Sequence, residues 1–600
     1  MNNQYNPLVN AHTTMGRHAL KYGFRFQIGQ LNSFGAGRAG GLFRMDRRFT
    51  QGPDPTRTTL NSGHDFASFL LGTPSSGYVD LNASRALQNT YWATYIQDDW
   101  KATGRLTLNV GLRLERESAP TDRFDRGTGG LDFSIASPVE AGAKANYARN
   151  PIPELRELNA KGGLEFLNVG GTPRGALDMP SVIWAPRIGA AYRLTNRLVW
   201  RGGTGLFYIP NNVNNYRQDG FSLATQMVAS LDGGITPFHT LSNPFPNGLT
   251  QPPGASGGLL TGVGQSLTAG VSPSSGVPPY LHGLSHQFSS GFQAVLPGDV
   301  SLEANYVGNI SQRMTLTRRI NDYPNEFLAL RTRLNARVAN PFFGVITNPT
   351  SALSQSTTTV QQLLRPFPHF IGVTQAVLPY GRSHYDSLQV QGSKRLRNGM
   401  TLGGSYTLAK LLESTSYLNN NDAKPEKVIS NSDRPQRLVL YGSYELPFGQ
   451  GKSLFNSANP VVKRVAGGWQ MNWVVTYQSM DPLAFGGAER LSRSSNNPRT
   501  VDEWFDVKQF VPQEPFTLRQ LSTRVADLRS QGIRRWDFSV LKNTILTERV
   551  KMQLRGEFYN FFNTTHFAAP NTSVTNASFG RITGTFLGPR EIQVAMRLEF

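Results

Sequence analysis

The chain has 600 residues, with 60 Lys or Arg against 40 Asp or Glu, which gives a formal net charge of +20. It contains no Cys, and this excludes a disulfide scaffold, a zinc–thiolate site and an iron–sulfur cluster. Its charged fraction of 17% lies below the roughly 25% of ordinary soluble domains, and its aromatic fraction of 10% is too high for a disordered chain.

No stretch of the sequence approaches the ~18 consecutive apolar residues of a transmembrane helix, so a helical membrane protein is excluded. The first residues, Met1 to Pro7, lack the basic start and apolar core of a signal peptide. A transmembrane β-barrel is compatible with the low mean hydropathy of −0.35, because its strands alternate apolar and polar residues.

Apolar and polar residues alternate along several segments, and the first clear case lies at 105–116. Leu108 and Leu112 alternate there with Asn109 and Arg113. Successive side chains of a strand point to opposite faces, so one face of such a segment is apolar and the other is polar. The runs approach the ~9–11 residues of a tilted membrane strand, whereas strands of soluble proteins usually have ~5–6.

In chain order, this pattern predicts about sixteen strands, an even number as in single-chain bacterial barrels. We expect them at 18–29, 41–50, 75–86, 90–100, 105–116, 184–194, 197–208, 285–296, 299–310, 385–396, 399–411, 436–446, 467–479, 534–545, 549–562 and 590–600. Short turns alternate with long, irregular segments rich in Gly, Pro, Ser and Asn, at 117–183, 210–284, 312–383, 412–434 and 482–533. The predicted fold is therefore all-β: an antiparallel transmembrane β-barrel with short periplasmic turns and long extracellular loops.

This interpretation gives two sets of side chains a role. Polar residues on the polar strand faces are candidates to face the barrel lumen, namely Arg113, Glu115, Lys551, Gln553, Arg555 and Glu557. Aromatic residues near the predicted strand ends are candidates for the girdles at the membrane–water interfaces, namely Tyr91, Trp92, Trp100, Trp200, Tyr208, Trp469, Trp473 and Tyr477. The alternative for the aromatic set is the core of a soluble sheet, but strand length and loop asymmetry favour girdles.

Several segments, taken in their order along the chain, resemble one family. They are Tyr95–Lys101 with Arg105–Arg113, Ala185–Gly189, Asp433–Pro435 with Tyr444–Gly449, Gly468–Gln470, Gln553–Asn563 and Phe579–Ile582. Together they resemble the TonB-dependent outer-membrane receptors, and within them the large Oar-like subgroup.

The resemblance implies a barrel of about 22 strands that holds an N-terminal plug preceded by a TonB box. It also implies uptake of a scarce nutrient, such as a metal chelate or an oligosaccharide, with energy delivered through TonB. We expect no cofactor. A strand is expected from about Ala19, which leaves no room for a signal peptide, TonB box or plug. We therefore expect residues 1–600 to be the C-terminal barrel portion, which would contact TonB only through the missing N-terminal part.

The last predicted strand carries Ile592, Val594, Met596 and Leu598 on one face and ends at Phe600. An alternating strand with a C-terminal Phe resembles the signal that the barrel assembly machinery reads by strand pairing and side-chain pockets. The alternative is that Phe600 only anchors the strand at the lipid interface.

Motifs associated with enzymes are weak in this sequence. Gly35–Gly40 matches G-x-G-x-x-G, but a strand-like run follows it where a dinucleotide site needs a helix. Gly254–Gly258 matches G-x-S-x-G, but within a Gly/Pro/Ser-rich loop. Asp98 and Asp99 would point to opposite faces of a strand, and the nine His are scattered. We expect no catalytic residue, no metal site and no enzyme activity.

The net charge of +20 has two open interpretations. Nucleic-acid binding needs Lys and Arg clustered on one face, whereas here they are spread along the chain, so nucleic acid is not an expected partner. Basic residues in a lumen would attract anions, and basic residues at the rims would contact the phosphates of outer-membrane lipid.

Three functions remain, all in the bacterial outer membrane. The first is a transporter or receptor barrel for TonB-dependent uptake. The second is a passive porin of about sixteen strands. The third is a surface adhesion or scaffold barrel, which would explain the long loops but not the polar residues that alternate along the strands.

Overall fold

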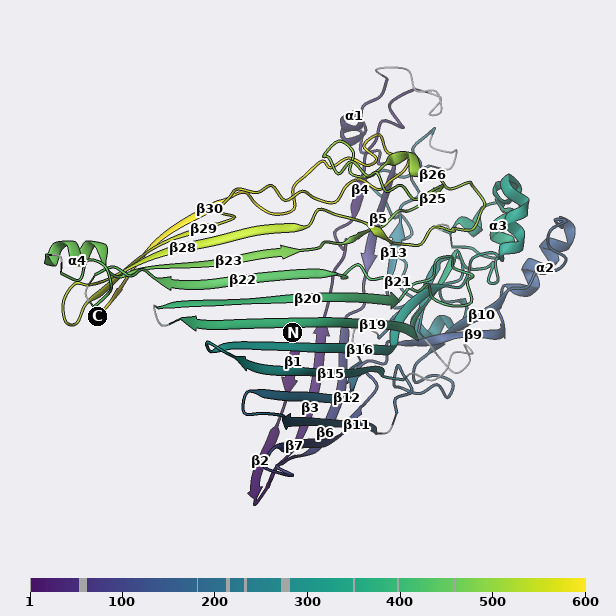
Figure 1. Ribbon diagram of the computed structural model, residues 1–600. Coiled ribbons are helices and arrows are strands. Elements are labelled where there is room, and N and C mark those ends of the chain that lie inside the picture. Colours follow the sequence, from purple (N-terminus) through teal and green to yellow (C-terminus); the bar gives the residue numbers. More distant parts are fainter. Residues whose placement is uncertain are drawn as a thin grey trace.

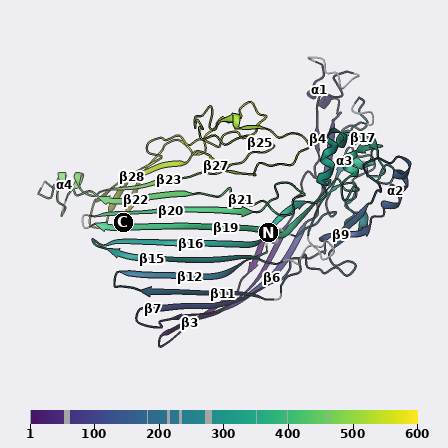
Figure 2. The same ribbon diagram turned by 45° about the vertical axis from the view of Figure 1, so that its right-hand side comes forward.

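The structure is a computed structural model that describes residues 2–52, 62–180, 182–211, 216–230, 235–270, 281–348, 351–396, 399–449, 451–457 and 459–600. One broad antiparallel sheet dominates it, with folded loops gathered beyond one end of the strands and the short helix α4 (Pro460–Ala466) beyond the other (Figure 1; Figure 2). No helix in the described part of the chain is both long and apolar enough to cross a membrane.

Fifteen long strands follow one another through the described part of this sheet, if β1 and β2 are counted as one because both pair with β3. Their bounds are β1 (Asn2–Tyr5), β2 (Leu8–Met15), β3 (His18–Ser33), β6 (Arg85–Trp100), β7 (Leu106–Glu117), β11 (Ile183–Arg193), β12 (Leu198–Ile209), β15 (Gly283–Leu296), β16 (Val300–Arg319), β19 (Gly372–Leu396), β20 (Met400–Ser414), β22 (Gln436–Glu445), β23 (Trp469–Gln478), β28 (Ile533–Ile545), β29 (Lys551–Tyr559) and β30 (Glu591–Glu599). Each long strand pairs antiparallel with the next one along the chain, so the all-β prediction is confirmed.

The smaller elements lie in the long connections. They are β4 (Leu42–Arg44), α1 (Asp65–Leu70), β5 (Ser76–Leu81), β8 (Thr121–Asp122), β9 (Thr128–Ala136), α2 (Glu140–Arg149), β10 (Lys161–Phe166), β13 (Leu223–Gln226), β14 (Ser266–Ala269), β17 (Arg337–Ala339), β18 (Thr357–Thr359), α3 (Val360–Leu363), β21 (Val428–Ile429), β24 (Pro482–Leu483), β25 (Ala488–Arg490), β26 (Phe510–Pro512) and β27 (Val525–Arg529). Three of them, β8, β14 and β21, add short pairings to the main sheet, and most of the others pair among themselves.

The register of the pairings collects most of the apolar residues of the long strands on one face of the sheet. In the middle of the sheet, Leu388 of β19 stands opposite Tyr306 of β16 and Leu408 of β20. The next residue, Gln389, stands opposite Asn305 and Thr407 on the other side of the sheet. A one-residue slip anywhere would exchange the two sets, so the alternation in the sequence fixes the register. We call these two sides the apolar face and the polar face.

Connections of five residues or fewer alternate with long ones, as predicted, with one exception at 446–468 on the short-turn side. Two predicted strands, 41–50 and 75–86, are wrong as spanning strands. They contain β4 and β5, which pair with each other and with β13 in a three-stranded sheet within the loops. Short alternating runs satisfy either arrangement, and the sequence does not distinguish them.

The strand expected from about Ala19 is preceded by β1 and β2, which the sequence analysis missed. β1 is mostly polar, and β2 places Val9, Ala11 and Met15 on the apolar face, but the two strands are short and interrupted, so neither shows the long alternation of the other strands. Pro7 separates the two strands because it has no N–H to donate to the ladder, although its carbonyl still accepts from the N–H of Phe26.

The buried core of the described chain lies largely in the long loops. One cluster, which includes Leu131, Phe342 and Phe370, joins the connections 118–182, 210–282 and 320–371. A second cluster includes Phe485 and Phe510, whose rings stack at 4.1 Å between centroids. The loops are therefore folded rather than irregular, because their scattered apolar residues meet across different connections. We call the folded part of the loops the cap.

Candidate functional site

The lumen candidates of β7 lie on the polar face, close to the cap. Arg113 forms an ion pair with Glu115 at 2.5 Å between Nε and Oε1. The Arg113 guanidinium also donates to the hydroxyl of Tyr91 on β6, at 2.9 Å. These three side chains are joined on one face because β6 and β7 are paired in register.

The other four candidates lie on the polar face of β29. Arg555 donates to Gln553 at 2.9 Å and approaches Glu557 at 3.5 Å, and Gln553 donates to Asn543 of β28 at 2.8 Å. Lys551 begins the same strand on the same face. The six predicted residues therefore form two separate clusters, one on β6 and β7 and one on β28 and β29.

A cavity of about 770 Å³ opens on the polar face where β1, β3, β6 and β7 reach the cap. Glu115 lines it together with Arg25, Tyr91 and Glu117. The Arg25 guanidinium lies 5.9 Å from the centre of the Tyr91 ring. The lining thus offers a cation, carboxylates and an aromatic ring, which suits a polar solute rather than an apolar one.

Glu117 is the most buried charged group of this cavity, with 5% of its surface exposed. Its carboxylate accepts from Asn89, from the backbone N–H of Asn211 and lies 3.0 Å from His282 Nε2. No sequence pattern predicts this group, because Glu117 and His282 are 165 residues apart. The alternation of β7 places Glu117 on the polar face, but no local pattern identifies its partners.

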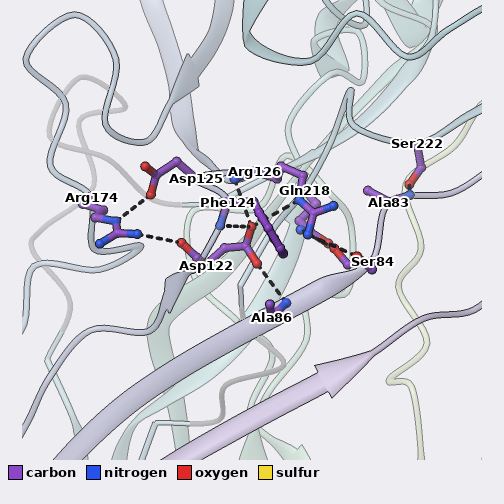
Figure 3. A network of polar contacts seen from close by, with 10 residues as sticks. All are labelled: Ala83, Ser84, Ala86, Asp122, Phe124, Asp125, Arg126, Arg174, Gln218 and Ser222. Carbon is purple, nitrogen blue, oxygen red and sulfur yellow. Dashed lines mark hydrogen bonds and ion pairs between the residues drawn. The ribbon is translucent and has the colours of Figure 1, made fainter. Parts of the chain in front are cut away.

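Asp122 lies at the centre of a network of polar contacts at the start of the 118–182 connection (Figure 3). Its carboxylate is fully buried and accepts from the backbone N–H of Ala86 at 2.9 Å and of Arg126 at 3.1 Å. Arg174 donates to the Asp122 carbonyl at 3.1 Å and to Asp125 at 2.5 Å, which lowers the pKa of Asp125 below its usual value. The start of the 118–182 connection is thereby fixed to β6.

Two ion pairs join the 415–435 connection and the end of β20 to the 479–532 connection. Arg529 contacts Asp433 at 2.6 Å, and Asp433, with 1% of its surface exposed, also accepts from the N–H of Leu411. Arg524 pairs with Glu413. Charged side chains that are shielded from water depend on their ion-pair partners, so these two contacts stabilise the fold of the cap.

Most of the aromatic candidates lie on the apolar face, and the register assigns Trp92, Trp100, Trp200, Tyr208, Trp469, Trp473 and Tyr477 to it. Tyr91 corrects the expectation, because it points to the polar face and bonds Arg113 there. Trp184 and Trp536 are not among the predicted candidates, but both are exposed on the apolar face near the cap. Their positions at the predicted strand boundaries were the available signal.

The C-terminal strand β30 has Ile592, Val594, Met596 and Leu598 on the apolar face, and all four are exposed. β30 pairs with β29 and ends at Glu599, and Phe600 follows with 92% of its surface exposed. A reading of this strand by the assembly machinery stays a prediction.

The remaining motifs lie in surroundings that differ from those of the enzyme sites that they resemble. The Gly35–Gly40 segment leads into β4, not into a helix. The Ser256 hydroxyl donates to the carbonyl of Pro253. Asp98 contacts His18 at 2.6 Å and Asp99 contacts Lys21 at 2.8 Å, and the two carboxylates lie on opposite faces of β6 as predicted. Among the described residues, no three His, Asp or Glu side chains gather as metal ligands.

The fold and the two faces define a membrane-embedded β-sheet protein, and comparison with known proteins identifies its family. The family described as "Outer membrane beta barrel domain" matches residues 1–593. The chain therefore belongs to this family of bacterial outer-membrane proteins. A search of curated protein sequences finds no matching relative.

Several solved structures are similar to the whole chain. They include the FpvAI–pyocin S2 complex (TM-score 0.42, 10% identity, 49% of that chain), the copper transporter OprC (0.42, 9%, 56%) and the ferric yersiniabactin uptake receptor FyuA from Yersinia pestis (0.41, 10%, 54%). The match covers 100% of this chain, which thus spans about half the length of those proteins.

Proposed function

We propose that this barrel takes up a scarce nutrient, such as a metal chelate or an oligosaccharide, across the outer membrane with energy supplied through TonB. The observation that supports the proposal is the folded cap at one end of the strands, with the 770 Å³ cavity of the polar face beside it. Its finer identity as an Oar-like receptor rests on the sequence resemblance. Contact with TonB would run through an N-terminal plug segment.

The cap favours a receptor over the two alternatives on physical grounds. A receptor holds its ligand in a defined geometry, and side chains fixed by packing and hydrogen bonds supply that geometry. A passive porin would use the polar face but needs no cap with its own buried core. An adhesion barrel would use the cap but needs no polar face along the full length of the strands.

In this proposal the polar face lines the lumen and the apolar face contacts lipid. Arg113, Glu115 and the β29 cluster would then contact solute in a water-filled interior. The aromatic residues of the apolar face would lie at the two interfaces. Phe600 and the alternating residues of β30 would be read by the barrel assembly machinery during insertion.

A growth experiment with the native gene tests this proposal. We expect its deletion to slow growth on limiting iron supplied as a hydroxamate chelate, or on an oligosaccharide as sole carbon source. Loss of TonB should produce the same defect, and adding the gene back should not rescue the strain without TonB. Uptake that persists without TonB, together with steady ion conductance of the purified chain in a planar bilayer, would establish the porin instead.

A further inference from the structure

The connection 446–468 is an exception among the short turns and carries the helix α4 (Figure 1; Figure 2). The side chain of Asn459 caps the helix by accepting from the N–H of Val462 at 2.8 Å, and Pro460 occupies its first turn. The helix therefore has a regular N-terminal cap. Its sequence is Pro-Val-Val-Lys-Arg-Val-Ala, and Gly467 caps its C-terminus.

The helix exposes its apolar residues. Val461 and Val465 lie one turn apart on the same side, with 72% and 65% of their surfaces exposed, and no residue of the helix is buried. Leu454 and Phe455 of the same connection are exposed as well. An apolar surface of this kind on a short connection indicates contact with something outside the described chain.

The contacts of α4 fix the side of the sheet on which it lies. The indole N–H of Trp469 donates to the carbonyl of Val465 at 3.0 Å. The ammonium group of Lys542 donates to the carbonyl of Arg464 at 2.6 Å and to that of Gly467. Trp469 and Lys542 stand opposite each other on the apolar face. The helix is thus held beside the face that contacts lipid, at the end of the short turns.

Charged residues flank the apolar side of the helix. Lys463 and Arg464 follow the two leading valines, and the Arg464 guanidinium donates to the carbonyl of Ile545, the last residue of β28, at 2.9 Å. Apolar side chains flanked by cations match the boundary between acyl chains and phosphates. The described part of this connection exposes five large apolar side chains, namely Leu454, Phe455, Val461, Val462 and Val465. A protein partner is disfavoured, because these side chains cannot bury the ~1,000 Å² of a stable interface.

We propose that α4, together with Leu454 and Phe455, forms an interfacial anchor that inserts into the periplasmic leaflet of the outer membrane and binds anionic phospholipid headgroups. Val461 and Val465 enter the acyl region, and Lys463 and Arg464 contact the phosphates. The anchor continues the lipid-facing surface of β23 and β28, and it assigns part of the net positive charge to lipid. The role of this anchor does not depend on which solute the barrel carries.

Because the chain has no Cys, a single introduced Cys carries a fluorescent label at one defined place. We would label V465C, with S495C on the exposed cap side as the matched control, and reconstitute the full chain in vesicles. The vesicles contain phosphatidylcholine with or without phosphatidylglycerol, and either lipid is supplied with brominated acyl chains. Circular dichroism and heat-modifiable migration establish that each variant is folded.

We expect a blue-shifted emission for the V465C label and quenching by brominated lipid, more strongly by phosphatidylglycerol than by phosphatidylcholine. K463E should remove this preference, and K508E, the same charge change on the cap side, should leave it unchanged. The S495C label should be quenched by neither lipid. A V465C label as solvent-exposed as that of S495C would overturn the proposal, and so would a blue shift without quenching, which would indicate a protein contact. Equal quenching by both lipids would refute the headgroup contact.

Discussion

The ion pair between Arg529 and Asp433 gives the sharpest test of how the cap is held. In R529A, the Asp433 carboxylate keeps its bond from the Leu411 N–H but loses its cation in a site with 1% exposure. Breaking a buried pair costs ~3–5 kcal/mol, and we take the low end, about 3 kcal/mol, because the Arg529 side chain is 19% exposed. Since about 1.4 kcal/mol corresponds to a factor of ten, local opening should become about a hundredfold more frequent.

Hydrogen exchange followed by mass spectrometry on the purified chain measures this change. The increase should be confined to 415–435 and 479–532, and the paired strands β20 and β22 should keep wild-type protection. R581A is the control, because its ion pair with Asp502 is long and exposed and should contribute less than about 1 kcal/mol. Unchanged exchange in R529A would refute the reasoning, and so would an increase spread evenly over the long strands.

Three further predictions concern other parts of the chain. Burial lowers the pKa of His369 to about 4, so protonation of this side chain opposes folding of the cap. The stability of the cap should be greatest above about pH 6.5 and should fall by roughly 3 kcal/mol as the pH decreases toward 4. Hydrogen exchange measured against pH tests this, and a flat profile would contradict it. F505A removes a fully buried ring from the second core cluster and should cost about 3–5 kcal/mol, detected as faster proteolysis within 479–532 but not within the long strands. F600A should lower the heat-modifiable, assembled fraction in outer membranes several-fold, while F586A, in an exposed connection, should not; equal yields would leave Phe600 as an interfacial anchor only.

The long strands could be predicted because their physical signal is local. Alternation over about ten residues specifies both the strand and the face of each side chain, as β7 and β29 illustrate. β1 and β2 are not predictable in the same way, because four and eight residues interrupted by Pro7 are too short for the alternation to stand out. Tyr91 is a girdle candidate only because it lies near a strand end. The alternation along β6 places it on the polar face and its neighbour Trp92 on the apolar face.

The cap could not be predicted because its contacts join distant residues. Asp433 and Arg529 are 96 residues apart, and Glu117 and His282 are 165 apart. Their sequence surroundings, rich in Gly, Pro and Ser, resemble those of unstructured loops. The sequence resemblance did include Asp433, but the reason for an acid at that position becomes visible only with its partner in place.

The assignment of the two faces is the central claim, and adjacent residues of β19 test it most directly. Single cysteines at Leu388 and Gln389 differ by one residue in the middle of the sheet but lie on opposite faces. In intact outer membranes, we predict that Q389C reacts with a small water-soluble thiol reagent, and that L388C is protected from it and reacts with a lipid-soluble one. The reverse pattern, or equal reaction of both with the water-soluble reagent, would contradict the account.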